Sequence, residues 1–562
     1  MRILRIATRG SHLAVAQAEY VQERLKELGV SSELVIIKTT GDLNYASFTE
    51  LAKRGDETKG LFTKEIEEAL LKNTADIAVH SLKDLPTKSH KGLIVAALPQ
   101  RLDYRDYLIF RKDKKSQDQL PFIKNDGVVG TSSFRRKSML RFFFPSLKTK
   151  DIRGNVPTRI KKLFFDDIDA ILLSGAGLER LSQKSDWIDE KYLSEIEIVP
   201  LDAEVFPPSP GQGTIAVQCR ESDKEIIELL KQIHDPQIEN IIHIERGLLA
   251  KLEGGCHLPL GIHSKYSQEH SLYQANLFLG KEYPYSKKKK DFYLKRYHKD
   301  RALLVEFLHE EITEDLPIVL FGKEEKLNEI SKKFLTQSIL YFPIMEVKHY
   351  KEIQKHVLIS SPIEKESIHR IYAIFSVEGI KSLEHHNFED SPLIFVNGKK
   401  SKETLLNLFP ELKENEVFIS HDGTAFGIAE MIMASYKNQP KIIYAITAKE
   451  SRNEFFDFLM NHNDNNTHLE QWITYEIQSR TLTKEELDSI PEKAYLIFGS
   501  PSLFDAFYSS LKNHNYFIEE KTKKWRLICL GKTTFQHILR KGFSVYAMSS
   551  EPSYEKIIKE FL

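Results

Sequence analysis

The sequence predicts a protein of the α/β class that is built from several domains. Runs with the period of a strand alternate with runs with the period of a helix along most of the chain. The chain has 562 residues, too many for one hydrophobic core, so we expect about three to five domains. Polar residues, and arginines above all, directly follow several strand-like runs. Ligands of open parallel sheets bind beyond the carboxyl ends of strands, so this placement favours a ligand-binding or catalytic protein.

The charge balance and the cysteines exclude several classes of function. Lys+Arg and Asp+Glu both number 80, so no excess charge favours a nucleic acid or an acidic surface as partner. Cys219, Cys256 and Cys529 are widely separated, which excludes a disulfide scaffold and a cysteine-rich zinc site and fits a reducing compartment. The chain enters a strand-like run without an apolar signal segment, and no apolar run approaches the roughly 18 residues that span a bilayer. We therefore expect a cytoplasmic protein with no metal site and with neither nucleic acid nor membrane as partner.

The first strand–helix–strand pattern places polar residues at the end of a strand. Residues 3–8 are expected to form a strand, and Ser11 is placed to cap a helix over residues 13–28. A second strand is expected over residues 34–38, and this order of elements predicts a parallel sheet. Arg9 and Ser11 would then lie where a ligand binds. The alternative for Arg9 is a solvated surface charge.

The next strand ends in a lysine–aspartate pair. Lys59-Gly60-Leu61-Phe62 leads into a helix over residues 63–72, and residues 75–79 are expected to form a buried strand. His80-Ser81-Leu82-Lys83-Asp84-Leu85-Pro86 follows at its carboxyl end. An acid beside a lysine in this position is a candidate general acid/base or a stabiliser of a cation. Alternatively, Asp84 caps a helix while Lys83 points to water.

A second α/β unit begins after the crossing at residues 101–105. Residues 127–130 run into Thr131-Ser132-Ser133-Phe134-Arg135-Arg136 at the start of a helix. Such a turn offers backbone N–H groups, hydroxyls and a positive helix end, all suited to an anion. Asp151-Ile152-Arg153-Gly154-Asn155-Val156-Pro157-Thr158-Arg159 repeats the theme, and Arg180 follows the strand expected over residues 169–173.

Six arginines share this position near the ends of strands: Arg9, Arg135, Arg136, Arg153, Arg159 and Arg180. Together they indicate a ligand with many negative charges, and guanidinium groups are well suited to carboxylates. A nucleic acid would be the competing ligand. The absence of interleaved aromatic residues and of a basic excess argues against it.

A cysteine on a loop follows these two units. Residues 206–219 return the chain into a strand, which places Cys219 in the core. One helix is expected over about residues 225–252, followed by Glu253-Gly254-Gly255-Cys256-His257-Leu258-Pro259. Glycines and proline favour an accessible loop thiol, although a buried, inert cysteine is the alternative. Strands are expected over residues 272–279 and 292–297, with Lys287–Lys290 as a hairpin tip in solvent.

Seven motifs in this order resemble the hydroxymethylbilane synthase (porphobilinogen deaminase) family over residues 1 to about 312. They are Thr8-Arg9-Gly10-Ser11, Lys59-Gly60-Leu61-Phe62, His80-Ser81-Leu82-Lys83-Asp84, Gly130-Thr131-Ser132-Ser133-Phe134-Arg135-Arg136, Arg153-Gly154-Asn155-Val156, Pro210-Gly211-Gln212-Gly213 and Glu253-Gly254-Gly255-Cys256. The resemblance implies two periplasmic-binding-protein-like domains and a small third α/β domain that carries the cysteine. Their implied ranges are 1–100 with about 200–222, then 101–199, then 223–312.

The same resemblance implies a reaction and a cofactor. A dipyrromethane cofactor would be joined to Cys256 by a thioether, and four porphobilinogen molecules would be added head to tail with loss of ammonia. Asp84 would stabilise each cationic azafulvene, with Lys83 beside it. The residues implied to hold the cofactor and the acidic side chains of the growing chain are Arg9, Ser11, Lys59, Ser81, Thr131, Ser132, Ser133, Arg135, Arg136, Arg153, Arg159, Arg180 and Gln212.

The second half begins a new α/β pattern after a linker near residues 313–317. Three late motifs resemble the uroporphyrinogen-III synthase family over residues 315–562. They are Trp472-Ile473-Thr474-Tyr475-Glu476, Ile497-Phe498-Gly499-Ser500-Pro501-Ser502 and Leu530-Gly531-Lys532-Thr533-Thr534. The resemblance implies two lobes, 315–346 with 476–562 and 350–472, joined by a two-strand linker. Ser376-Val377-Glu378-Gly379 replaces the turn that is usual in the family.

The implied second reaction closes hydroxymethylbilane into a ring, inverts its last pyrrole and releases water. Tyr475 would donate a proton to the leaving hydroxyl, and Ser500, Thr533 and Thr534 would bind carboxylates. The alternative for Tyr475 is a core aromatic with its hydroxyl at the rim.

Three hypotheses about function follow. The leading one is a bifunctional enzyme of tetrapyrrole (porphyrin, haem) biosynthesis, acting on porphobilinogen and hydroxymethylbilane. A narrower alternative is hydroxymethylbilane synthase alone, with a degenerate C-terminal regulatory or binding domain. The rival from another class is a binding protein that senses a carboxylate ligand. The sequence assigns no oligomeric state.

Overall fold

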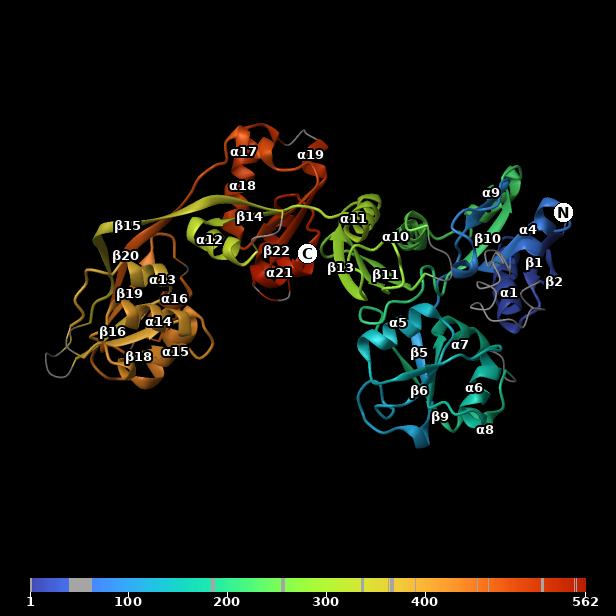
Figure 1. Cartoon of the computed structure of the whole chain (residues 1–562), viewed down its shortest axis with the longest axis horizontal. Helices are drawn as coiled ribbons and strands as arrows, with labels where there is room; N and C mark the ends of the chain where they lie inside the picture. The colour runs from blue at the N-terminus through green and yellow to red at the C-terminus, as the bar shows by residue number, and fades with distance from the viewer. Residues whose placement is uncertain are drawn as a thin grey trace. The chain divides into compact units, whose positions relative to one another are not determined.

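The computed structural model forms two compact units. The first holds Met1–Leu316, Arg526–Ser550 and Lys556–Leu562, and the second holds Pro317–Trp525 and Glu551–Glu555. Figure 1 shows the elements of each unit. The structure describes residues 3–39, 63–182, 187–253, 258–334, 338–361, 363, 368–389, 391–451, 453–462, 464–516, 520–549, 551 and 553–561. Within these residues no helix is long and apolar enough to cross a membrane.

The first sheet of unit one has the order β2-β1-β3-β10-β4. Its strands are β1 (Leu4–Arg9), β2 (Ser32–Ile37), β3 (Ile77–Ser81), β4 (Leu93–Ala97) and β10 (Ile215–Arg220). Its helices are α1 (His12–Glu27) and α4 (Lys64–Leu71). β1 pairs with β2 and β3 in parallel, as predicted. Ser11 caps α1 by accepting a hydrogen bond from the backbone N–H of Ala14, and Cys219 lies fully buried in the core, which confirms both predictions.

The second sheet has the order β7-β6-β8-β5-β9. Its strands are β5 (Asp106–Arg111), β6 (Val128–Gly130), β7 (Lys148–Lys150), β8 (Ala170–Ser174) and β9 (Ile196–Pro200), and its helices are α5 (Phe134–Phe143), α6 (Val156–Phe165), α7 (Gly175–Ser182) and α8 (Glu190–Leu193). The chain leaves the first sheet after β4 and returns to it as β10, and a bridge between Arg101 and Thr214 joins the two crossing segments. This is the expected periplasmic-binding-protein-like layout of two α/β domains.

The third domain corrects the prediction of one helix over about residues 225–252. Two helices occupy this range, α9 (Lys224–Lys231) and α10 (Pro236–Lys251). Asp235 caps α10 by accepting a hydrogen bond from the N–H of Gln237, and Pro236 takes the first position of that helix. Proline cannot continue a preceding helix but is well suited to start one, so the chain breaks here.

The third sheet consists of three antiparallel strands. They are β11 (Leu260–Ser267), β12 (Leu272–Leu279) and β13 (Phe292–His298), followed by α11 (Arg301–Thr313). The prediction that Lys287–Lys290 forms a solvated hairpin tip is wrong for two of its lysines. Lys288 is half-buried and donates a hydrogen bond to the backbone oxygen of Glu560, and Lys287 pairs with Asp315.

Unit two is built around a long pair of antiparallel strands. β15 (Ile339–Ile359) is 21 residues long and pairs with β20 (Thr467–Ser479); both are labelled in Figure 1. On one side of this pair lie β16 (His369–Ile374), β17 (Leu393–Val396), β18 (Val417–Ile419) and β19 (Lys441–Ala448), and on the other side lie β14 (Ile318–Lys323) and β21 (Ala494–Phe498). The helices of this unit are α12 (Glu324–Lys333), α13 (Val377–Lys381), α14 (Lys399–Leu408), α15 (Ala425–Ser435), α16 (Glu454–Asn461), α17 (Lys484–Ser489), α18 (Pro501–Asn513) and α19 (Glu520–Lys523). Strands thus lie on both sides of the β15–β20 pair, and the division into the lobes 315–346 with 476–562 and 350–472 stays a prediction.

The last elements of the chain are β22 (Trp525–Leu530), α20 (Lys532–Arg540), β23 (Ala547–Ser549) and α21 (Tyr554–Phe561). Most of their residues belong to the first compact unit, although the sequence motif that contains Thr533 and Thr534 resembles the second family.

Candidate active site

The lysine–aspartate pair lies at the carboxyl end of β3, in the short 3₁₀ turn Leu82–Asp84. The side chain of Asp84 is exposed, whereas Lys83 is half-buried and its Nζ donates a hydrogen bond to Oε1 of Gln212 at 3.3 Å. Burial lowers the pKa of Lys83, and the carboxylates of Asp84 and Asp106 offset this lowering in part. Ser81 exchanges hydrogen bonds with Gln17 on α1, which holds the strand end against that helix.

Arg135 and Arg136 share one buried carboxylate. Oδ2 of Asp106 lies 2.7 Å from a guanidinium nitrogen of Arg135, and Oδ1 lies 2.7 Å from one of Arg136. Gln212 donates a further hydrogen bond to Oδ1 at 2.9 Å. Burial opposes the ionisation of Asp106, but the charges of the two arginines outweigh it and hold the pKa of this carboxyl well below its usual range. The structure therefore joins Lys83, Gln212 and both arginines into one cluster around Asp106.

This cluster keeps an excess of positive charge. Two guanidinium groups face one carboxylate, and the half-buried Lys83 lies beside them. Arg159 is within electrostatic reach of Arg136 and Arg153, and burial followed by these two charges lowers the pKa of Arg159 to about 10. An anion with several carboxylates would relieve this repulsion, as expected for a polycarboxylate site.

Arg159 and Arg180 are partly anchored by backbone oxygens. Nε of Arg159 donates to the oxygen of Gly154 at 2.7 Å. Arg180 is buried and donates to the oxygen of Gly213 at 3.3 Å, in the segment that returns the chain to the first sheet. Burial lowers the pKa of Arg180 to about 10.

The Thr131-Ser132-Ser133 turn uses its hydroxyls to shape the start of α5. Ser133 accepts a hydrogen bond from the N–H of Arg136, and Thr131 accepts one from the N–H of Ser133. Ser132 exchanges two hydrogen bonds with the backbone of Ile152. These hydroxyls position the two arginines at the helix start.

Arg9 is half-buried at the end of β1, and Ser11 is occupied as the cap of α1. Lys59 and Cys256 lie outside the residues that the structure describes. The last described residue before Cys256 is Glu253, whose φ of 51° lies in the left-handed region.

Sequence reasoning missed three residues that build this site. Asp106 is the counter-ion of the arginine pair, and Arg101 forms two hydrogen bonds, of 2.9 and 3.0 Å, with the fully buried Glu245 of α10. Glu245 also accepts a hydrogen bond from the N–H of Gly211 at 2.8 Å, so it ties α10 to both crossing segments. The sequence carried a signal for this contact, because Glu245 interrupts the apolar pattern of a helix and Arg101 lies in a charged crossing segment.

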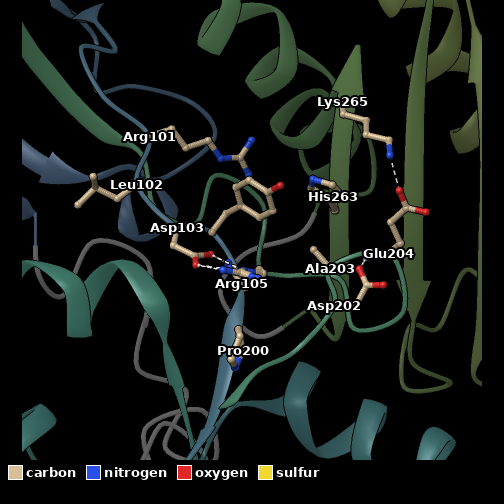
Figure 2. Close-up of a pocket in the computed structure, with 11 residues that line it drawn as sticks. Arg101, Leu102, Asp103, Arg105, Pro200, Asp202, Ala203, Glu204, His263 and Lys265 are labelled. Atoms are coloured by element: carbon tan, nitrogen blue, oxygen red, sulfur yellow. Dashed lines mark hydrogen bonds and ion pairs between the residues drawn. The ribbon is translucent and has the colours of Figure 1, made fainter. Parts of the chain in front are cut away.

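A cavity of about 610 Å³ adjoins the crossing segments, on residues other than the predicted ones (Figure 2). It is lined by Arg101, Leu102, Asp103, Tyr104, Arg105, Pro200, Asp202, Ala203, Glu204, His263 and Lys265. Its charges are mostly paired with one another, as Arg105 is with Asp103, and Lys265 with Glu204. Tyr104 stacks on His263 with ring centres 4.6 Å apart, and burial lowers the pKa of His263 to about 4. Because its charges are mostly paired, this cavity fits a polycarboxylate less well than the arginine cluster does.

In unit two, Tyr475 lies buried on β20 with its hydroxyl 2.8 Å from Oγ of Ser376. Ser376 caps α13 by accepting a hydrogen bond from the N–H of Gly379. Burial raises the pKa of Tyr475, and the hydrogen bond to Ser376 offsets only part of this. Ser376 was noticed in the sequence only because its turn differs from the family pattern; the structure makes it the partner of the tyrosine.

A small group of titratable residues lies on the Glu378 side of this pair. Glu378, in the first turn of α13, lies 3.4 Å from Nε2 of His349 and 3.7 Å from Nζ of Lys323. Tyr475 itself feels the charge of Glu378, and its ring centre lies 6.2 Å from that of His349.

The other predicted residues of the second half lie at helix starts. Ser500 caps α18 by accepting a hydrogen bond from the N–H of Leu503, and its hydroxyl lies 3.1 Å from that of Ser502. Thr533 is exposed and Thr534 is buried in the first turn of α20. Ser500 belongs to unit two and both threonines to unit one.

Comparison with known proteins finds two families in the chain. Residues 4–228 match the family model "Porphobilinogen deaminase, dipyromethane cofactor binding domain", and residues 240–291 match "Porphobilinogen deaminase, C-terminal domain". Residues 342–559 match "Uroporphyrinogen-III synthase HemD".

Individual relatives support the first match. The chain is 44% identical over 266 residues to porphobilinogen deaminase of Deinococcus radiodurans, covering 47% of this chain and 81% of that protein. It is 41% identical over 266 residues to that of Bacillus subtilis, covering 47% of this chain and 79% of that protein. Among solved structures, uroporphyrinogen-III synthetase of Helicobacter pylori aligns at 17% identity with a TM-score of 0.29, covering 44% of this chain and 98% of that one.

Proposed function

We propose how the residues of this chain carry out two reactions, because the chain belongs to the porphobilinogen deaminase family and carries a uroporphyrinogen-III synthase domain after it. The presence of both domains in one chain favours the bifunctional enzyme over the monofunctional alternative. The first module makes hydroxymethylbilane from four molecules of porphobilinogen with release of ammonia. The second closes this product, with inversion of the last ring, to uroporphyrinogen III.

The observation that carries the first assignment is the position of Asp84 next to a cationic cluster. Asp84 is exposed at a strand end, directly after Lys83, which reaches Gln212 and the arginine pair around Asp106. A chain of six pyrroles brings about a dozen carboxylates, and guanidinium groups bind carboxylates with two hydrogen bonds each. The cluster therefore binds the acidic side chains, while the exposed carboxylate stays available for the reacting ring.

The chemistry of the first step assigns a role to Asp84. In each addition the carbon–nitrogen bond of porphobilinogen breaks, and a carbon–carbon bond forms between its aminomethyl carbon and the free pyrrole carbon of the chain. The hydrogen of that pyrrole carbon is lost as a proton, so the departing amine and this proton together account for the ammonia released. Positive charge develops on the incoming ring, and a fixed carboxylate stabilises it more than water does. Asp84 stabilises this charge and accepts hydrogen bonds from the pyrrole N–H groups. Lys83 and the arginines hold the carboxylates still.

The cofactor site follows from the chemistry of the three cysteines. Residues 4–228 match the domain that binds dipyrromethane in this family. Cys219 and Cys529 are fully buried, and burial raises the pKa of the Cys219 thiol to about 11 and raises that of Cys529 as well. A thioether forms from an accessible, reactive thiol, so Cys256 is the residue left to carry the cofactor. When bound, dipyrromethane supplies the free pyrrole position that accepts the first porphobilinogen.

In the second module we assign the proton donor to Tyr475. Its raised pKa keeps the phenol protonated at neutral pH, so it can donate to the hydroxyl that leaves hydroxymethylbilane as water. Ser376 orients this hydroxyl through the 2.8 Å hydrogen bond. Ser500, Thr533 and Thr534 are the proposed contacts to substrate carboxylates. The cytoplasm is the proposed compartment, because the buried thiols fit a reducing environment.

The experiment that tests the first module is intact mass spectrometry of the purified full chain. We expect the chain to be heavier than its translated mass by one dipyrromethane, and Cys256→Ser to lack this addition and to leave porphobilinogen unconsumed. Cys219→Ser is the matched control and should keep the addition. An unmodified chain that still consumes porphobilinogen would refute the assignment of Cys256.

The isomers of the product test the second module. With porphobilinogen as substrate, the full chain should form mainly the type III isomer, whereas Tyr475→Phe should lower the rate of its formation at least about tenfold and raise the share of type I. Consumption of porphobilinogen should stay unchanged. Tyr444→Phe, a buried tyrosine on the neighbouring β19, is the control. If the unmodified chain yields only type I, the synthase assignment is wrong.

A further inference from the structure

Helix α11, at the end of the first module, is buried over more than half of its residues. Leu304, Val305, Phe307, Leu308 and Ile312 are buried, together with the acids Glu310 and Glu311. Apolar residues and two buried acids on one helix require cover from other elements, and α10 and β13 supply part of it. Further cover comes from the C-terminal segment between β22 and α21.

The first contact is a buried ion pair joined by two residues from the C-terminus. Arg296 of β13 donates two hydrogen bonds to Glu311 of α11, at 2.8 and 2.6 Å, and both side chains are almost inaccessible to solvent. The hydroxyl of Tyr546 donates to the same carboxylate at 2.6 Å, and Glu560 of α21 accepts a hydrogen bond from Arg296 at 2.8 Å. The guanidinium also lies 4.6 Å from the ring centre of Phe561.

The second contact is an ion pair between β22 and α11. Arg526 of β22 is fully buried and forms an ion pair with the buried Glu310 of α11. Its guanidinium carbon lies 4.2 Å from the ring centre of Phe307, which in turn packs edge-on against Tyr546. Glu310 and Glu311 are thus neighbouring acids that both receive partners from the last segment.

Backbone hydrogen bonds complete the contact. The N–H of Tyr297 on β13 donates to the oxygen of Tyr546 at 2.9 Å. The N–H of Lys299 donates to Oγ of Ser544 at 3.3 Å, and its Nζ donates to the oxygen of Gly542 at 2.9 Å. Main-chain contacts of this kind require that the two segments keep one register.

We infer that the segment from β22 to α21 docks permanently on β13 and α11, so that the third domain of the deaminase module and the end of the synthase module fold as one body. The partner surface consists of the buried Arg526 and Tyr546 and of Glu560, which is exposed at the edge of the ionic network. Removing one partner from such a network leaves a buried charge without compensation, at a large cost in stability. The C-terminal segment is therefore a structural part of the first module.

Two further observations favour this inference. Arg296, Glu310 and Glu311 all lie between the stretches that match the two families, whereas their partners Arg526 and Tyr546 lie within the synthase match, so the network joins the synthase domain to residues that neither family model covers. The compact unit that contains the deaminase domains also contains Arg526–Ser550 and Lys556–Leu562. The inference goes beyond the proposed function and needs neither activity.

A disulfide trap in the full chain tests the docking directly. Lys299→Cys combined with Ser544→Cys places two thiols on residues that are in hydrogen-bond contact, so mild oxidation should link them in most molecules. Peptide mass spectrometry identifies the linked pair. The two single variants, and the double variant oxidised in denaturant, are the controls. If the folded double variant links no faster than the denatured one, the inference is overturned.

A double-mutant cycle on Glu310 and Arg526 gives a second, independent readout. In the full chain, Glu310→Gln and Arg526→Gln should each lower the unfolding midpoint in denaturant. The double variant should lose less than the sum, with a coupling of about tenfold or more in the unfolding equilibrium constant. The exposed pair Lys326 and Glu329 of α12 is the matched control, with a coupling near zero. Additive effects at Glu310 and Arg526 would overturn the inference.

Discussion

Asp84→Asn is expected to lower the rate of porphobilinogen consumption by the full chain at least about 100-fold, because the amide cannot offset the positive charge that develops as ammonia leaves. The side chain of Asp84 is exposed, so the change removes no core contact. The Tm should therefore stay within a degree or two of the parent value. Initial rates and thermal unfolding of the same preparation measure both effects.

A second exposed aspartate provides the control for this prediction. Asp113 also lies in a short 3₁₀ turn, Lys112–Lys114, after a strand of the same unit, and it pairs with Arg111. Asp113→Asn should leave the rate unchanged. A near-normal rate for Asp84→Asn would remove this residue from its proposed role, whereas slow turnover by both variants would indicate a general effect of charge.

Asp106→Asn should destabilise the protein and abolish turnover together. The change leaves Arg135 and Arg136 buried without their shared counter-ion, and breaking a buried ion pair in this way costs about 3–5 kcal/mol in the free energy of unfolding. Because the pKa of Asp106 is held below its unfolded value, its stabilisation is complete at neutral pH and is lost only as the pH falls below about 4. The difference between parent and variant should therefore shrink in strong acid. Denaturant unfolding at several pH values measures it.

A second substitution separates charge from packing. Adding Arg135→Met to Asp106→Asn removes one of the two unpaired charges, so the double variant should recover part of the lost stability but none of the turnover. No recovery would mean that Asp106 acts through its shape and hydrogen bonds rather than through its charge.

Much of the fold could be predicted from local pattern. Ser11 before a helical period specified the start of α1, and the apolar run around Cys219 specified a buried strand, because these features depend on neighbours in the sequence. The break at Pro236 had an equally local signal, which the helical period on both sides concealed. The length of β15 had none: beyond Met345 its residues are mostly charged or polar and exposed, and β20 makes them a strand by pairing with them.

The residues of the candidate sites could likewise be predicted only in part. Strand ends, a lysine–aspartate pair and recurrent arginines could be located in the sequence, since residue type and order are local properties. Their partners could not, because Asp106 meets Arg135 and Arg136 across about thirty residues, and Ser376 meets Tyr475 across 99. The sequence by itself determined which chemical groups this protein holds at its strand ends. Only the tertiary structure decided which of them are neutralised and which stay available, because burial and charge pairing depend on contacts between segments that are distant in the chain.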